Sequence, residues 1–222
     1  MMIEVVPSIL VATKEEFEAL VRKLEPVTNR VHLDILDGIF TSTQKTISGY
    51  EEVLALDTRP NGSSGRAKLQ FDVHLMVAHP QELMAQWFKT KVDRIFIQAE
   101  AQGDIKELLL EIKCQGRKAG LSLNPETSVD TITECLPMLD YVQFMTIHPG
   151  AYGRPFLADT VDKILNFHDL YPDITIAVDG GMNPQTARLV RNAGASIIIS
   201  GSYVEKSSDM VKAIAELKGE II

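Results

Sequence analysis

Two short stretches of the chain place a histidine two residues from a carboxylate. His32 and Asp34 lie in VHLDILDG, and Asp72 and His74 lie in QFDVHLM. Residues two apart on a β-strand point to the same face. Burying an imidazole or a carboxylate without a partner is unfavourable by several kcal/mol. The spacing therefore predicts that these side chains meet each other, or a cation, inside the protein.

A further carboxylate ends another apolar stretch, ITIAVDGG, which carries Asp179. Two imidazoles and two carboxylates suit a divalent transition metal such as Zn, Fe(II), Mn or Co. The predicted metal ligands are His32, Asp34, His74 and Asp179. Asp72 and Asp37 could then orient the ligands by accepting hydrogen bonds. Each of these residues alone could be a satisfied polar group or a turn former, so the prediction depends on three strand ends meeting.

Short apolar runs alternate with longer amphipathic segments along the chain. Strands are predicted at residues 3–6, 31–36, 69–75, 94–98, 120–123, 141–145, 175–178 and 196–200. Helices are predicted at residues 13–24, 49–56, 80–89, 105–117, 129–136, 158–170, 184–193 and 209–217. Eight strands, each followed by a helix, predict an α/β fold, a single (β/α)8 TIM barrel domain over residues 1–222. A doubly wound open sheet is the alternative, but Val6-Pro7-Ser8 lacks its glycine-rich turn.

Glycine-rich turns follow the last three predicted strands. They are HPGAYG at 148–153, GGMNP at 180–184 and SGS at 200–202. Glycines let backbone N–H groups approach a phosphate closely. In barrels the loops after the seventh and eighth strands often bind phosphate. Although ordinary turn chemistry explains any one of them, their positions together predict a phosphate ligand.

Composition and charge restrict the class of protein further. The 222 residues are 45% hydrophobic and 23% charged, with a net charge of −8. Such a balance argues against a nucleic-acid binder, and no apolar run is long enough to span a membrane. Cys114 and Cys135 show no metal or redox spacing, which favours reduced thiols in the cytoplasm. We expect a soluble protein that can form a homo-oligomer, with a surface loop at residues 58–66.

Seven short motifs resemble the ribulose-phosphate 3-epimerase family. They are PSIL at 7–10, HLDILDG at 32–38, DVHLM at 72–76, LNP at 123–125, MTIHPG at 145–150, VDGG at 178–181 and ISGSYV at 199–204. They occur in the family's order and span nearly the whole chain. The resemblance implies a ribulose-phosphate-binding type of (β/α)8 barrel. It also implies a metal-dependent isomerase of the pentose phosphate pathway that converts D-ribulose 5-phosphate into D-xylulose 5-phosphate.

The resemblance also implies roles for individual residues. His32, Asp34, His74 and Asp179 match the family's metal ligands, and Asp34 and Asp179 match its acid/base pair. Inversion next to a carbonyl needs two proton carriers on opposite sides of the substrate, which agrees with one carboxylate from the second strand and one from the seventh. Residues in substrate-binding positions are Ser8, His74, Gly150, Ala151, Tyr152, Gly153, Gly180, Gly181, Gly201 and Ser202. Pocket-lining positions are Met76, Met145 and Leu36.

Three departures from the family pattern bear on the substrate. The segment DGIFTSTQ replaces DGHFVPN, PGAYGR replaces PGFGGQ and thereby introduces Arg154, and Gln98 stands where histidine is common. All three are expected on the substrate side of the pocket. They leave open a ketohexose 6-phosphate such as allulose 6-phosphate as substrate, and also a barrel that binds a sugar phosphate without catalysis. Barrels with decarboxylase or aldolase chemistry commonly use Mg²⁺ with oxygen ligands, against which the two histidines argue.

Overall fold

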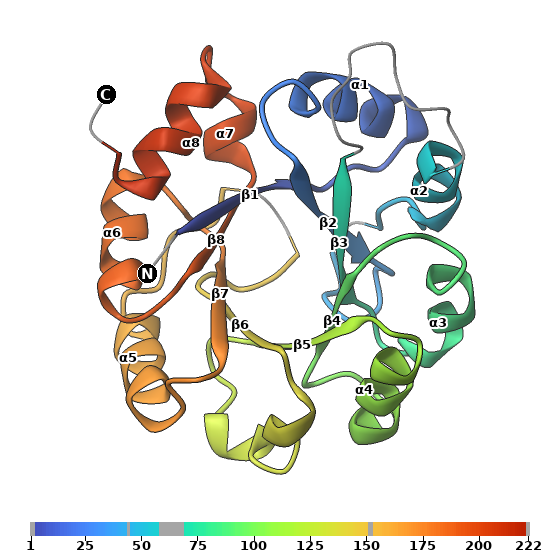
Figure 1. Cartoon of the computed structure of the whole chain (residues 1–222), viewed down its shortest axis with the longest axis vertical. Coiled ribbons are helices and arrows are strands. Elements are labelled where there is room, and N and C mark those ends of the chain that lie inside the picture. Colours follow the sequence, from blue (N-terminus) through green and yellow to red (C-terminus); the bar gives the residue numbers. More distant parts are fainter. Residues whose placement is uncertain (1–2, 44, 58–68, 151–152, 221–222) are drawn as a thin grey trace.

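Eight parallel strands form a closed barrel in the order in which they occur along the chain (Figure 1). The computed structural model describes residues 3–43, 45–57, 69–150 and 153–220. The strands are β1 (Glu4–Ile9), β2 (Arg30–Leu36), β3 (Gln70–Met76), β4 (Arg94–Gln98), β5 (Lys118–Leu123), β6 (Tyr141–Met145), β7 (Thr175–Asp179) and β8 (Ile197–Ser200). Since β8 pairs with β1, the barrel prediction is confirmed and the open sheet is wrong. The predicted loop at 58–66 lies outside the described residues.

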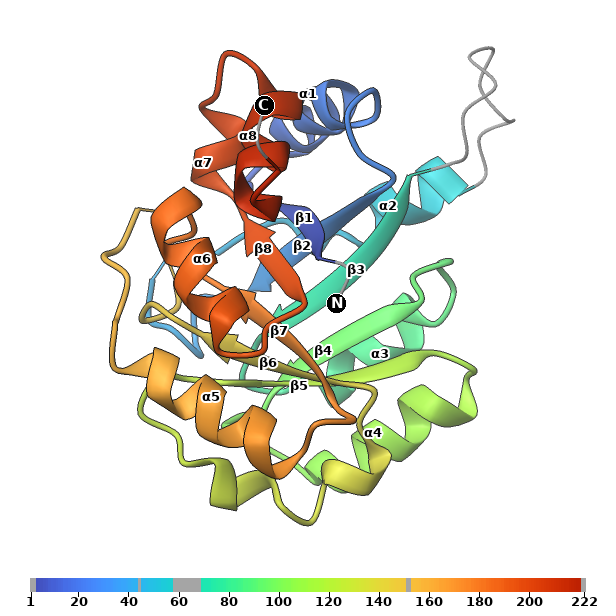
Figure 2. The same cartoon turned by 60° about the vertical axis from the view of Figure 1, so that its left-hand side comes forward.

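Helices surround the barrel on its outside (Figure 1 and Figure 2). They are α1 (Lys14–Leu24), α2 (Tyr50–Asp57), α3 (Gln81–Trp87), α4 (Ile105–Cys114), α5 (Thr160–Leu170), α6 (Pro184–Asn192), α7 (Ser202–Glu205) and α8 (Met210–Lys218). The predicted capping box begins α1, where Thr13 accepts from the Glu16 N–H and the Glu16 side chain accepts in return. None of the described helices is both long and apolar enough to cross a membrane.

The helix predicted at residues 129–136 is wrong. Two 3₁₀ helices occupy this region, η1 (Val129–Ile132) and η2 (Leu136–Met138). Hydroxyl groups compete with the helical backbone here, since Thr131 Oγ1 donates to the Ser128 carbonyl and Thr133 Oγ1 to the Asp130 carbonyl. Several β-branched residues, followed by Pro137, disfavour a longer α-helix further. The short α7 was not predicted, because four residues are too few to show helical periodicity.

Alternation along each strand separates two buried regions. Outward-facing residues such as Leu33 and Val73 pack in the main hydrophobic core. Inward-facing residues fill the barrel, where a small apolar cluster surrounds Phe96. In the register of β2 and β3, His32 is paired with Asp72 and Asp34 with His74. Their inward placement follows from the two-residue spacing that the sequence shows.

Candidate active site

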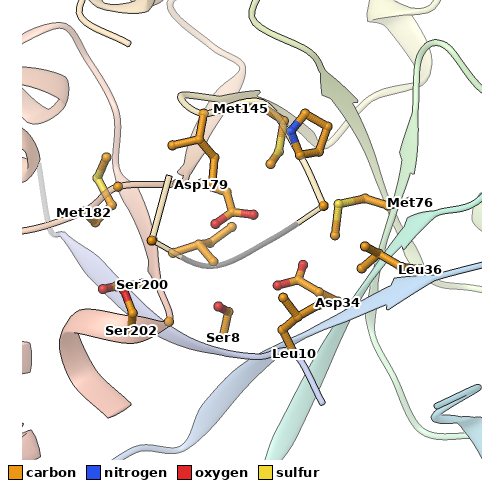
Figure 3. Close-up of a pocket in the computed structure, with 18 residues that line it drawn as sticks. Ser8, Leu10, Asp34, Leu36, Met76, Met145, Asp179, Met182, Ser200 and Ser202 are labelled. Carbon is orange, nitrogen blue, oxygen red and sulfur yellow. The ribbon is translucent and has the colours of Figure 1, made fainter. Parts of the chain in front are cut away.

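A cavity opens where the strands end (Figure 3). Its described walls are Ser8, Leu10, Asp34, Leu36, Met76, Met145, Ile147, Pro149, Gly150, Gly153, Asp179, Gly180, Gly181, Met182, Ile199, Ser200, Gly201 and Ser202. Figure 3 shows the carboxylates of Asp34 and Asp179 entering the cavity from opposite sides. Leucine and methionine side chains cover part of the walls. A cavity of this kind can hold a small polar molecule against two acid groups.

The four predicted metal ligands converge at the floor of this cavity. One potential ligand atom from each of His32, Asp34, His74 and Asp179 lies within 4.8 Å of the others. His74 Nδ1 is 3.2 Å from Asp34 Oδ1 and 4.0 Å from Asp179 Oδ2, and His32 Nε2 is 3.7 Å from Asp34 Oδ1. Two atoms bound to one metal ion by bonds of about 2.2 Å can lie at most roughly 4.5 Å apart. All three separations are shorter than this limit.

Burial leaves this cluster short of hydrogen-bond partners. Both ring nitrogens of His32 are buried without a hydrogen bond to another described residue. A buried polar atom without a partner is unfavourable by about 1–3 kcal/mol, and a cation can supply the missing interaction for a ring nitrogen. Burial also keeps the pKa of His32 well below its ordinary value and lowers that of His74 to about 4. Both imidazoles are therefore neutral near pH 7, which is the form that binds a metal.

The two carboxylates are held in an environment that resists their charge. Burial raises the pKa of Asp34 to about 8, although a hydrogen bond from Ser8 opposes the rise. Burial and the nearby Asp34 carboxylate raise the pKa of Asp179 to about 8. Desolvation of the charged form is the main cause in both cases. A divalent cation would offset this desolvation, so the donor set and its electrostatics both fit a metal ion.

Glycine turns form part of the cavity wall. Gly180 and Gly181 have φ values of +114° and +66°, a region that side chains other than glycine rarely adopt. A Cβ atom on Gly180 would lie 2.5 Å from Cγ1 of Ile147. The predicted residues Gly150, Gly153, Gly180, Gly181, Gly201 and Ser202 all line the cavity. Ala151 and Tyr152 lie outside the described residues.

Asp72 and Asp37 do not orient the metal ligands as expected. Asp72 lies deeper in the barrel, where it forms ion pairs with Arg30 and Arg94. Asp37 lies above the barrel and accepts backbone hydrogen bonds from Ala78, Ile39 and Phe40. Asp72 therefore stabilises the lower interior of the barrel, and Asp37 stabilises a loop turn.

Gln98 also differs from its expected place on the substrate side. It is fully buried and does not line the cavity. Its amide instead lies 2.9 Å from His74 Nε2. His74 is itself fully buried and absent from the cavity wall, so its position favours a role as a ligand over direct contact with a substrate. Arg154 is likewise not among the described lining residues.

Two polar residues at or near the site were given no role of their own from the sequence, although Ser200 belongs to the predicted turn at 200–202. Ser200 lines the cavity, and its buried Oγ has no hydrogen-bond partner among the described residues. Gln143 lies in the barrel interior, with Nε2 3.1 Å from His74 Nδ1. Gln143 alternates with apolar residues in YVQFM, which gives its face but not the group that it reaches.

Comparisons with known proteins match the chain to one family. A model of the family described as "Ribulose-phosphate 3 epimerase family" matches residues 4–205. The ribulose-phosphate 3-epimerase of Bacillus subtilis is 36% identical, over 98% of this chain and 99% of its own. That of Chlamydia pneumoniae is 34% identical, over 96% and 93% of the two chains.

Solved structures show the same fold at lower sequence identity. KGPDC from Streptococcus mutans superposes with a TM-score of 0.73 at 11% identity, covering 99% of this chain and 97% of its own. The 3-hexulose-6-phosphate synthase from Salmonella typhimurium gives a TM-score of 0.69 at 13% identity and covers 98% of both chains. These two likenesses concern the fold alone. With the family model matched across nearly the whole barrel, the chain belongs to the ribulose-phosphate 3-epimerase family.

Proposed function

We propose that this protein interconverts D-ribulose 5-phosphate and D-xylulose 5-phosphate by inverting C3. The observation that carries the proposal is the pair of buried carboxylates, Asp34 and Asp179, on opposite sides of one cavity. Inversion at a carbon next to a carbonyl requires one group to remove the proton from one face and another to supply a proton to the opposite face. Family membership and the names of the close relatives support the same reaction.

The environment of the two carboxylates suits proton transfer. Burial raises their pKa values to about 8, and a bound divalent cation would oppose this rise. The balance of the two effects would set how readily each carboxylate accepts and releases a proton near neutral pH. The hydrogen bond between Ser8 and Asp34 would fix the direction of one carboxylate. In the forward reaction one aspartate takes the C3 proton, while the other, already protonated, delivers its proton to the other face.

His32, His74, Asp34 and Asp179 would hold one divalent metal ion. Such an ion would supply Lewis-acid stabilisation of the negative charge that develops on the substrate oxygens next to C3. The two neutral histidines and the low exposure of all four side chains support a transition metal. Zn, Fe(II), Mn and Co all remain suitable for these nitrogen and oxygen donors.

The substrate phosphate would bind at the glycine turns after β7 and β8. Gly180, Gly181, Gly201 and Ser202 line the cavity there, and Gly180 and Gly181 have backbone conformations suited to close approach. The phosphate would then lie at one end of the cavity and the reacting carbon between the aspartates. Ser200, whose Oγ has no partner among the described residues, is close enough to contribute to this end.

A coupled assay of the metal-loaded protein tests the reaction directly. Turnover of D-ribulose 5-phosphate to D-xylulose 5-phosphate is expected, with a kcat/KM higher than for allulose 6-phosphate. A clear preference for the hexose phosphate would replace the proposed substrate but keep the chemistry. Binding of both sugars without exchange of the C3 proton with solvent deuterium would refute catalysis altogether. A cytoplasmic location of the protein and its assembly into a homo-oligomer stay predictions.

A further inference from the structure

We propose that Gln98 is a positioning residue, which holds His74 with a proton on Nε2 and with the Nδ1 lone pair directed toward Asp34 and Asp179. The inference concerns a side chain that lies outside the cavity and contacts the site only through His74. It rests on the proposed function insofar as the site is taken to hold a metal ion. The orientation of His74 follows from hydrogen bonding alone.

Three neighbouring groups determine how the Gln98 amide is oriented. They are His74 Nε2 at 2.9 Å, Glu100 Oε2 at 3.0 Å and the Ser122 carbonyl oxygen at 3.2 Å. The carboxylate and the carbonyl only accept hydrogen bonds, so the amide nitrogen must point to them and donate to both. The amide oxygen then faces His74 Nε2, and only a protonated Nε2 can donate to it.

The other side of the His74 ring gives an independent reason for the same tautomer. Gln143 Nε2 lies 3.1 Å from His74 Nδ1, and an amide nitrogen is a donor only. An unprotonated Nδ1 accepts this hydrogen bond, whereas a protonated one would oppose it. The same Nδ1 is the ring atom that lies near the carboxylates of Asp34 and Asp179, so a metal ion bound there would take this lone pair in place of the hydrogen bond from Gln143.

Glu100 makes the orientation of Gln98 rigid. Its Oε1 accepts from the Asn124 backbone N–H at 2.9 Å and from the Thr127 hydroxyl, which leaves Oε2 for Gln98. The Gln98 side chain is fully buried, so water has no access to replace either partner. A continuous series of hydrogen bonds thus runs from the loop after β5, through Glu100 and Gln98, to His74.

Loss of this support should be measurable as loss of metal affinity. Removal of the group that accepts from the second nitrogen of a metal-bound histidine typically weakens binding by about 10–100-fold. Gln98→Leu keeps a similar volume but removes both amide groups, whereas Gln98→His offers one acceptor and one donor again. Ser122→Ala is the matched control, since it removes a buried hydroxyl that bonds Gln143 and leaves the Ser122 carbonyl and Gln98 in place.

The experiment combines NMR of the histidine rings with Zn²⁺ binding. Long-range ¹H–¹⁵N spectra of metal-free protein labelled at histidine nitrogens identify the tautomer of His74, and competition with a chromophoric chelator gives the Kd for Zn²⁺. We expect a single Nε2–H tautomer in the wild type and in Ser122→Ala. Gln98→Leu should show mixed tautomers and a Kd raised about 10–100-fold, and Gln98→His should restore most of the affinity.

An Nδ1–H tautomer or a mixture in the wild type would overturn the inference without reference to any variant. Wild-type tautomer and Kd in Gln98→Leu would overturn it as well. If Gln98→Leu does not fold, the wild-type spectrum and the affinity of Gln98→His still decide. A wild type that shows the Nε2–H tautomer but binds no Zn²⁺ would contradict the metal-dependent function and leave the role of Gln98 in orienting His74 intact.

Discussion

Replacing the two cavity aspartates one at a time should separate the two halves of the proton transfer. Asp34→Asn and Asp179→Asn keep the shape of each side chain and an oxygen donor, but neither amide can act as a base. The carboxylates are only 4% and 8% exposed, so solvent water has little access to take over their task. Loss of a general base costs about 10²–10⁴ in rate, equivalent to about 2.7–5.4 kcal/mol of barrier. We expect the upper end of this range for epimerisation in both variants.

Exchange of the C3 proton with solvent, measured for each variant and each epimer, distinguishes this two-base scheme from alternatives. Each epimer presents its C3 proton to one aspartate, so each variant should retain exchange with solvent deuterium for one epimer and lose it for the other. The two variants should retain opposite epimers. NMR of D-ribulose 5-phosphate and D-xylulose 5-phosphate incubated separately in D₂O measures this, with Zn²⁺ content checked in each sample because both residues are also candidate ligands. Retention of the same epimer by both loaded variants would refute the assignment.

Other predictions concern the metal, a loop contact and a carboxylate outside the site. Chelation of the bound metal should abolish turnover and lower the unfolding temperature, because an ion present at 100 times its Kd stabilises the fold by about 2.7 kcal/mol; re-addition of Zn²⁺ without recovery would contradict this. Gly150→Ala places a Cβ 2.6 Å from Thr43 Oγ1 at a φ of +112°, so KM should rise roughly tenfold for about 1–2 kcal/mol of strain. Gly153→Ala is also strained at a φ of +78° but meets no described atom within 4 Å, so it should change KM less, which steady-state kinetics can compare. Although partial burial opposes it, hydrogen bonds from Ala119, Lys118 and Lys113 lower the pKa of Asp140. The stabilisation that ionised Asp140 gives to the folded protein is therefore complete above its unfolded pKa of about 3.9. It is lost as pH falls through the lower pKa of the folded protein. Asp140→Asn should therefore unfold more easily at pH 7, by about 1 kcal/mol, and this difference from the wild type should shrink as pH falls through the lowered folded pKa, as urea titrations would show.

Strands were predictable because their evidence is local. Apolar runs of four to seven residues bounded by polar or glycine-containing segments gave all eight strands, with ends that differ from the structure by up to three residues. Residues 129–136 failed because hydroxyl groups and Pro137 act against a helix that apolar spacing alone favours. In that region the competition between side chains and backbone decides the conformation.

The face of a strand was predictable, but the depth of a residue in the barrel was not. His32, Asp34 and His74 could be assigned to inward faces from a two-residue spacing, and the structure brings them together with Asp179. Asp72 has the same spacing from His74 and the same inward face, yet it pairs with Arg30 and Arg94. Two residues along a strand correspond to about 6.6 Å, which is enough to move a carboxylate away from the four candidate metal ligands.

Depth is decided by which strands supply neighbours at the same level. Strands in a barrel are tilted and staggered, so Asp72 of β3 lies beside Arg94 of β4 in the register, while His74 lies beside Phe96. A carboxylate in the interior needs a cation at its own level, and the chain provides arginines at the level of Asp72. Asp34 and Asp179 have no arginine or lysine among the described residues of the cavity wall. The absence of a side-chain cation at that level is the physical reason why we propose that a metal ion, rather than a further ion pair, completes the site.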